Sequence, residues 1–298
     1  MGQVPSTPFV VWIWRGITVR LPGTWEMLQF STDYTRGRCA FADRYQYRFE
    51  LSWSIVKGEP DYDRMVGDYM GKLEREKAGS DLVRLRHAGW HGFTGTVSGT
   101  PTTRLGRYLP ALGCLVEGVF LWTDRRDEAL EHQVIASMAA SPPDTRGHQR
   151  WRAAGLDLNV PGVAALEGCT LQPAKASFSF SNPKTGTTWQ FERLGMVPNW
   201  FTGDLPAWLT HHLGTGLHDL RLTTTTRSGH AVVLAEASFK PRALHLRRGH
   251  LAANAWIEPA DGRLYAVTVR RRGQHPAEAA APGDLLAAAP DFTPRWTP

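Results

Sequence analysis

The chain has 298 residues, of which 42% are hydrophobic and 21% are charged. A single core rarely grows beyond about 250 to 300 residues, so this length favours two domains, and the composition excludes a largely disordered protein. The three cysteines lie at unrelated spacings, which excludes a disulfide framework or a cysteine zinc cluster and favours a reducing compartment.

The longest apolar run near the start, residues 9–14, is too short for a signal peptide or a membrane span, so we expect a soluble cytoplasmic protein. The first six residues fit the loose N-myristoylation pattern, which is common by chance. The net charge of +6 is uneven: residues 1–145 hold 17 basic and 17 acidic side chains, and the rest of the chain holds 17 and 11. This basic excess indicates either an ordinary solvated face or an anionic partner.

The first predicted element is a half-buried strand that occurs twice. Residues 17–23 (Ile-Thr-Val-Arg-Leu-Pro-Gly) precede residues 156–162 (Leu-Asp-Leu-Asn-Val-Pro-Gly) by 139 positions. Both segments alternate apolar and polar side chains and end at Pro-Gly, which is typical of a strand followed by a turn. Similar segments at a fixed separation indicate an internal repeat.

A further strand and a helix follow at nearly the same separation. Residues 49–51 and 189–191 both alternate, at an offset of 140. In residues 62–73, apolar side chains recur at i, i+3, i+4, i+7 and i+11, so they line one face of a predicted helix. The leucines of residues 205–213 form the matching helix of the second copy.

The segments after the helix also match in order. Residues 83–85 match 220–222 at an offset of 137, and residues 113–115 match 249–251 at an offset of 136. Such small drifts in offset are what loop insertions produce. The repeat therefore covers most of both halves of the chain.

The ends of the two copies are expected to differ. Residues 256–269 of the second copy contain a hairpin signal around Asp261-Gly262, which the first copy lacks at the matched position. The first copy closes instead with a predicted helix over residues 129–138, and residues 285–289 are a weaker counterpart.

A polar segment separates the two copies and contains two prolines, which interrupt any helix. We therefore predict a first module over residues 1–140, a linker over residues 141–150 and a second module over residues 151–298. The short strand connections favour antiparallel pairing, so the predicted fold class is α+β, with each module a mostly antiparallel β-sheet flanked by helices.

Several segments of the first copy resemble the PsbP-like superfamily. They are the strand ending at Leu21–Trp25, the strand at Phe49–Val56, the amphipathic helix, the Gly92-Phe93 pair and the closing Val134–Met138. That superfamily includes photosystem II extrinsic subunits, a Ran-binding nuclear import factor and bacterial chaperones of secretion effectors. The resemblance implies an antiparallel sheet flanked by helices and a chaperone-like or adaptor role in binding partner proteins, without enzymatic chemistry.

No catalytic or nucleotide-binding motif is present in the sequence. His211 and His212 are adjacent on the predicted helix and point in different directions, so they do not indicate a metal site. Asp61 and Asp63 lie where a helix begins and are interpreted as caps rather than as a catalytic pair. We therefore predict a protein that is not an enzyme and has no metal or cofactor.

The candidate binding residues come from the twelve tryptophans and the arginine-rich second half. Tryptophans near element edges either pack between the modules or face a partner, and Trp and Arg often dominate interfaces. The predicted partner-binding residues are Trp25, Trp90, Trp200, Arg247, Arg248, Arg270, Arg271 and Arg272. The leading hypothesis is a non-enzymatic protein-binding adaptor or scaffold. The alternative is binding of nucleic acid or an anionic surface through the basic second module.

Overall fold

The computed structural model describes residues 8–172, 174–227, 229–240 and 248–272. The chain divides into two compact units, Met1–Pro142 and Pro143–Pro298. Of the described residues, 57% lie in strands and 16% in helices. The predicted helix-flanked α+β fold is therefore wrong, and the chain is mostly β. Each predicted amphipathic stripe belongs to a single helix, Tyr62–Arg75 or Leu205–Leu213, whereas each unit contains a seven-stranded sheet.

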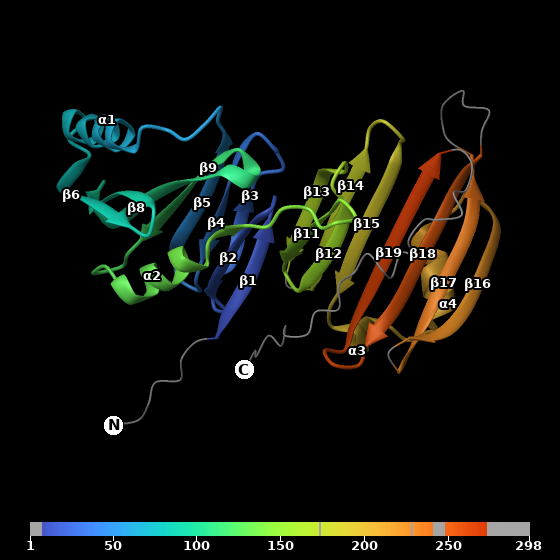
Figure 1. Ribbon diagram of the computed structural model, residues 1–298. Coiled ribbons are helices and arrows are strands. Elements are labelled where there is room, and N and C mark those ends of the chain that lie inside the picture. The colour runs from blue at the N-terminus through green and yellow to red at the C-terminus, as the bar shows by residue number, and fades with distance from the viewer. Residues whose placement is uncertain (1–7, 173, 228, 241–247, 273–298) are drawn as a thin grey trace. The chain divides into compact units, whose positions relative to one another are not determined.

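The first unit contains a seven-stranded antiparallel sheet with the order β3-β4-β5-β9-β8-β7-β6 (Figure 1). A smaller sheet forms where β1 and β10 both pair with β2. In chain order the elements are β1 (Phe9–Trp14), β2 (Ile17–Pro22), β3 (Glu26–Phe30), β4 (Arg36–Ala42), β5 (Tyr47–Ile55), α1 (Tyr62–Arg75), β6 (Gly79–His87), β7 (Trp90–Val97), β8 (Thr100–Leu109), a 3-10 turn (Pro110–Leu112), β9 (Cys114–Leu121), α2 (Glu128–Ser137) and β10 (Ala139–Ala140).

The second unit contains a seven-stranded antiparallel sheet with the order β13-β14-β15-β19-β18-β17-β16, together with the hairpin β11-β12 (Figure 1). In chain order its elements are β11 (His148–Ala153), β12 (Leu156–Pro161), β13 (Ala165–Gln172), β14 (Lys175–Asn182), β15 (Thr187–Leu194), α3 (Val197–Trp200), α4 (Leu205–Leu213), β16 (Leu217–Arg227), β17 (His230–Phe239), β18 (Gly249–Glu258) and β19 (Arg263–Arg272). Residues 148–150, which we expected in the linker, thus begin β11.

The two large sheets have the same strand order, and their irregularities also correspond. The first hairpin of each unit turns on a residue with positive φ followed by glycine, Arg15-Gly16 and Ala154-Gly155, at an offset of 139. This is the geometry of a two-residue turn that matches strand twist. Both edge strands of each sheet carry a β-bulge, in β3 and β6 and again in β13 and β16. Bulges at an edge discourage continuous pairing with another chain.

Two details of the predicted repeat are corrected by the topology. The hairpin β18-β19 is not an addition, because it occupies the place of β8-β9 in the first sheet. The match of residues 113–115 with 249–251 joined the start of β9 to the start of β18, which are not equivalent strands. Residues 285–289, the expected counterpart of α2, lie outside the described residues.

Helix α1 begins where the sequence predicts. The Asp61 side chain caps α1 by accepting a hydrogen bond from the Arg64 backbone N–H at 3.0 Å. Asp63 lies in the first turn, where a carboxylate favours the positive end of the helix dipole.

Each large sheet has two differently covered faces. In the first unit, α1 packs on one face, where Tyr69 stacks on Phe93, and we call this the helix face. The β1-β2 hairpin packs on the other, where Trp12 meets Phe41 edge to face, and we call this the hairpin face. In the second unit Leu209 of α4 lies in the core on the helix face. On these faces α1 contacts mainly β6 and β7, and α4 contacts mainly β17 and β18.

Candidate functional site

Two of the three predicted tryptophans belong to the core. Trp25 is buried and stacks on Phe49, with ring centroids 6.4 Å apart, and Trp90 is only 1% exposed. Both lie next to strand boundaries in sequence, but their rings are buried within the first unit and do not face a partner. Trp200 is 41% exposed, and its indole N–H donates to the Gly195 carbonyl oxygen at 2.8 Å. Of these three tryptophans, Trp200 is therefore the one that is exposed to solvent.

Arg270, one of the predicted binding arginines, contacts the end of α4. The Arg270 guanidinium donates to the Leu213 carbonyl oxygen at 3.2 Å, where α4 ends. A cation at the last turn of a helix stabilises the helix dipole. Arg270 is thus engaged within the second unit.

Among the described residues, Arg248, Arg271 and Arg272 do not all lie on one surface. Arg248 is exposed and lies 3.8 Å from Asp219. Partial burial lowers the pKa of Arg271, while Arg272 is exposed at the end of β19. Neighbouring side chains of a strand point to opposite faces, so the run from 270 to 272 is divided between both faces of the sheet. Arg247 lies outside the described residues.

The first unit has a shallow depression along β3, an edge strand of its large sheet in the part of the chain that the structure describes. The strand β3, the loop after it and the facing part of β4 supply its lining. The lining residues are Leu28, Gln29, Phe30, Ser31, Thr32, Gly37 and Arg38.

A β-bulge directs an apolar side chain into this depression. Met27 pairs with Phe41 and Gln29 with Ala40, so Leu28 is the extra residue and is 56% exposed. In the second unit the equivalent bulge displays Glu167 instead, at an offset of 139. The equivalent β-bulges therefore expose an apolar side chain in the first unit and a charged side chain in the second.

A close backbone approach shapes the floor of the depression. A Cβ atom on Gly37 would lie 2.5 Å from the Trp53 ring and 2.6 Å from the Ser31 side chain, so only glycine fits there. The loop beyond Ser31 is ordered by Asp33, whose carboxylate accepts from the Thr35 hydroxyl at 2.8 Å and the Thr35 N–H at 2.7 Å. The Thr35 hydroxyl and these backbone donors lower the pKa of Asp33, which stays ionised.

A buried arginine lies behind this loop. Arg15 is 4% exposed, and its guanidinium lies 4.0 Å from the Tyr34 ring centroid and 3.5 Å from the Cys114 sulfur. Its Nε and Nη2 atoms have no hydrogen-bond partner in the described part of the chain. Burial raises the pKa of Cys114, although Arg15 opposes this shift, so the thiol is protonated and unreactive at neutral pH.

The second unit contains a carboxylate–histidine pair that resembles part of a catalytic site. His212 of α4 lies 2.6 Å from the buried carboxylate of Glu192, and Lys175 lies 3.5 Å from the other oxygen. Burial alone would raise the pKa of Glu192, but the interactions with His212 and Lys175 together lower it. No hydroxyl or thiol among the described residues is hydrogen-bonded to His212, so the geometry ties α4 to β15 rather than activating a nucleophile.

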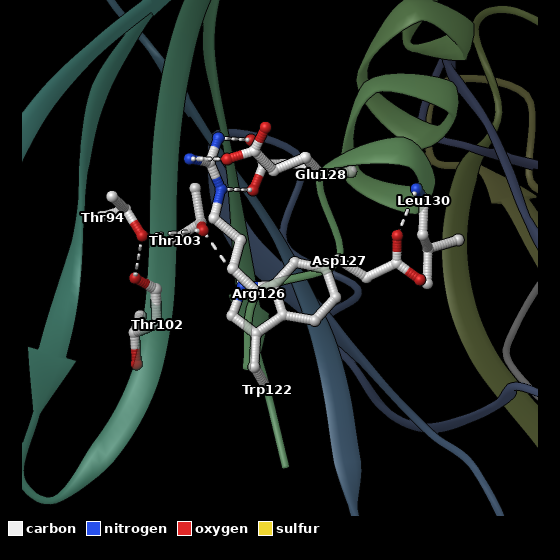
Figure 2. Close-up of polar contacts among 9 residues, drawn as sticks. Thr94, Thr102, Thr103, Trp122, Arg126, Asp127, Glu128 and Leu130 are labelled. Atoms are coloured by element: carbon white, nitrogen blue, oxygen red, sulfur yellow. Dashed lines mark hydrogen bonds and ion pairs between the residues drawn. The ribbon is translucent and has the colours of Figure 1, made fainter. Parts of the chain in front are cut away.

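A second ion pair fixes α2 in the first unit (Figure 2). Arg126 donates to both oxygens of Glu131, at 2.5 and 2.8 Å, and Glu131 is 1% exposed. Asp127 caps the helix by accepting from the Leu130 N–H at 3.0 Å. This side-chain cluster is dense, but every contact it makes is internal, so it is a structural support.

Within the described ranges, no three His, Cys, Asp or Glu side chains gather as metal ligands would. The same residues include no helix of sufficient length and apolar character to cross a membrane. No protein-family model matches the chain, and the search of curated proteins found no match.

Proposed function

We propose that this chain is a non-enzymatic protein-binding adaptor, and that the depression along β3 binds an extended segment of a partner protein. The observation that carries the proposal is the bulged Leu28, which the backbone holds in solvent at a sheet edge. An exposed edge offers unpaired backbone groups to an incoming strand, and pockets beside it select side chains.

The chemistry of the lining suggests the kind of segment. Leu28 and Phe30 offer apolar surface. The Arg38 side chain is 60% exposed and offers a positive charge, and its Nη1 atom lies 3.4 Å from the Glu50 carboxylate. An exposed ion pair of this kind has little net strength, so Arg38 is free to exchange partners. We infer a ligand segment with an apolar residue near an acidic one. The bulge restricts backbone pairing to the part of β3 after Leu28.

The repeat supplies a matched variant for the test. Leu28→Glu installs the residue that the second unit carries at its own bulge, so the variant is expected to fold. Peptides are selected on the full chain from a random displayed library, and their affinity is measured by titration. Leu28→Glu should weaken binding at least tenfold, whereas Val163→Glu, at an exposed apolar position of the second unit, should not. Peptides that bind both variants equally would place the site elsewhere.

Binding of nucleic acid or of an anionic surface has less support. Arg270 is engaged with α4, Arg248 lies near Asp219, and the run from 270 to 272 is divided between two faces. Non-specific nucleic-acid binding needs several cations on one surface and weakens steeply with salt. Retention of the chain on immobilised DNA or RNA that falls with added salt and with Arg271→Glu would favour this alternative.

Two further expectations stay proposals. The adaptor role agrees with the PsbP-like resemblance, but the chain is mostly β rather than the helix-flanked fold that this resemblance implies, so the proposal rests on the β3 edge instead. We also infer a cytoplasmic location, which the three free cysteines support.

A further inference from the structure

The second unit holds a buried arginine that is incompletely hydrogen-bonded within the part of the chain that the structure describes. Arg193 of β15 is 5% exposed, and its Nε atom has no hydrogen-bond partner among the residues that the structure describes. A buried donor without a partner costs about 1–3 kcal/mol, and more when the group is charged. Such a group calls for a ligand or a function to explain it.

The charged side chains that act on Arg193 are the Arg263 guanidinium and the Asp261 carboxylate. Arg263 of β19 is also largely buried, and its Nη1 atom lies 3.5 Å from Asp261. Asp261 also accepts from the Tyr265 hydroxyl at 2.8 Å and from the Arg263 N–H at 3.0 Å. The Asp261 carboxylate thus accepts two hydrogen bonds and forms one ion pair, and the Arg263 Nη1 atom has no hydrogen-bond partner among the described residues. Arg193, Arg263 and Asp261 together carry a net charge of +1.

The electrostatic cost of this arrangement shifts the pKa values of Arg193 and Tyr265. Burial, together with repulsion from Arg263, lowers the pKa of Arg193 to about 10. Burial and the neighbouring Asp261 raise the pKa of Tyr265, so its hydroxyl remains a neutral donor. Trp256 stacks on Tyr265, with ring centroids 5.6 Å apart, and covers one side of the cluster.

The first unit places a guanidinium in the corresponding region by a different route. At an offset of 140, Arg193 occupies the position of Trp53, and the strand pairings put Arg263 where the first unit has Cys114. Arg15, which lies against Trp53 and Cys114, comes from a turn whose counterpart is Ala154. Both units thus keep a buried, incompletely paired guanidinium on the hairpin face at the same end of the sheet.

We propose that Arg193, Arg263 and Tyr265 form a binding site for a carboxylate group, with Trp256 as its apolar wall. A single carboxylate neutralises the net charge of +1, and its two oxygens match the parallel N–H groups of a guanidinium. The site is separate from the β3 depression, so either proposal can fail alone.

Sodium acetate is the first probe, with sodium sulfate, sodium phosphate and sodium chloride compared at equal ionic strength. Acetate should raise the Tm of the full chain saturably and more than chloride does, because a ligand of the folded state stabilises it by mass action. Arg193→Met should raise the half-saturating concentration at least tenfold. The control Arg221→Met, at an exposed arginine of β16, should leave it unchanged.

The opposite outcomes are equally definite. An equal response of the native chain and Arg193→Met, or no response beyond that to chloride, would overturn the proposal. A response lost in Arg15→Met but kept in Arg193→Met would move the site to the first unit and overturn the assignment. A larger response to sulfate or phosphate would show that the site prefers another oxyanion and would overturn the carboxylate assignment. A short peptide with a free C-terminus, compared with its amidated form, distinguishes a peptide end from a small free acid.

The test does not depend on the folding of Arg193→Met. Arg193→Lys keeps the charge. In chain labelled with [¹⁵N]arginine, the Nε–H signal that this variant lacks is the signal of Arg193. A saturable shift of that signal with acetate supports the site, whereas a spectrum unchanged by acetate contradicts it.

Discussion

At the scale of single residues, the side chains that matter most here are those that break the local pattern. Leu28 is apolar where its edge strand faces water, and Arg15 and Arg193 are charged where the sheets are apolar. Natural proteins often break local rules at functional sites and compensate for the cost elsewhere. Arg193 could have been singled out from the sequence, because the offset of 140 aligns it with Trp53. Leu28 could not, because nothing in the sequence reveals the bulge.

Gly37→Ala tests the packing beneath the β3 depression. The new methyl group would meet the Trp53 ring and Ser31 at distances that real Cβ atoms do not adopt. We expect a loss of about 1–3 kcal/mol in the free energy of unfolding, as for other overpacked sites. Urea denaturation measures the loss. Gly58→Ala is the control, since a Cβ there meets nothing within 4 Å; equal effects of both variants would contradict the packing described.

Glu192→Gln tests the ion pair beneath α4. Because the folded state lowers the pKa of Glu192 below its ordinary value of 4.5, the ionised Glu192 carboxylate stabilises the fold above that pH, and this contribution is lost as the pH falls through the folded pKa. At pH 7 we expect a loss of about 1–3 kcal/mol. Denaturant titrations from pH 7 to pH 3 should show the difference from the native chain shrinking. A difference independent of pH, or one matched by exposed Glu236→Gln, would contradict this account.

At the scale of elements, the sequence predicts α1 and its Asp61 cap because a helical stripe and a capping residue are local signals. It also places the first strands of both copies on equivalent elements. The predicted repeat matches β9 with β18 instead of β19 because Gly113 and Gly249 were treated as equivalent. Gly113 ends a 3-10 turn with a φ of 58°, whereas Gly249 lies in β18 against the Phe239 ring. The same residue type serves two different physical purposes there.

Arg126→Met tests how α2 is held. The variant would leave the Glu131 carboxylate buried without its counter-charge, which typically costs about 3–5 kcal/mol. We expect an unfolding free energy reduced by that order, measured by denaturation in urea. Replacing both residues, in Arg126→Met with Glu131→Leu, should restore most of the loss. Arg125→Met, at the exposed neighbour, is the control, and a loss of the same size there would refute the role of the ion pair.

At the scale of the whole molecule, the chain carries two sheets of one strand order with different side chains at equivalent points. The bulge displays leucine in one unit and glutamate in the other, and the buried guanidinium comes from a turn in one and a strand in the other. The fold class was mispredicted because periodicity reveals each helix but not how few helices there are. Long-range strand pairing, which decides the architecture, leaves only weak local signals.

Hydrogen exchange on the full chain, with and without a selected peptide, tests the central claim most directly. If β3 receives an extended segment, the peptide should slow exchange at backbone amides of residues 29–32 and change little in the second unit, since a paired N–H is shielded from water. Slowed exchange confined to the second unit, or no change along β3 at saturating peptide, would contradict the proposal that this edge is the binding site.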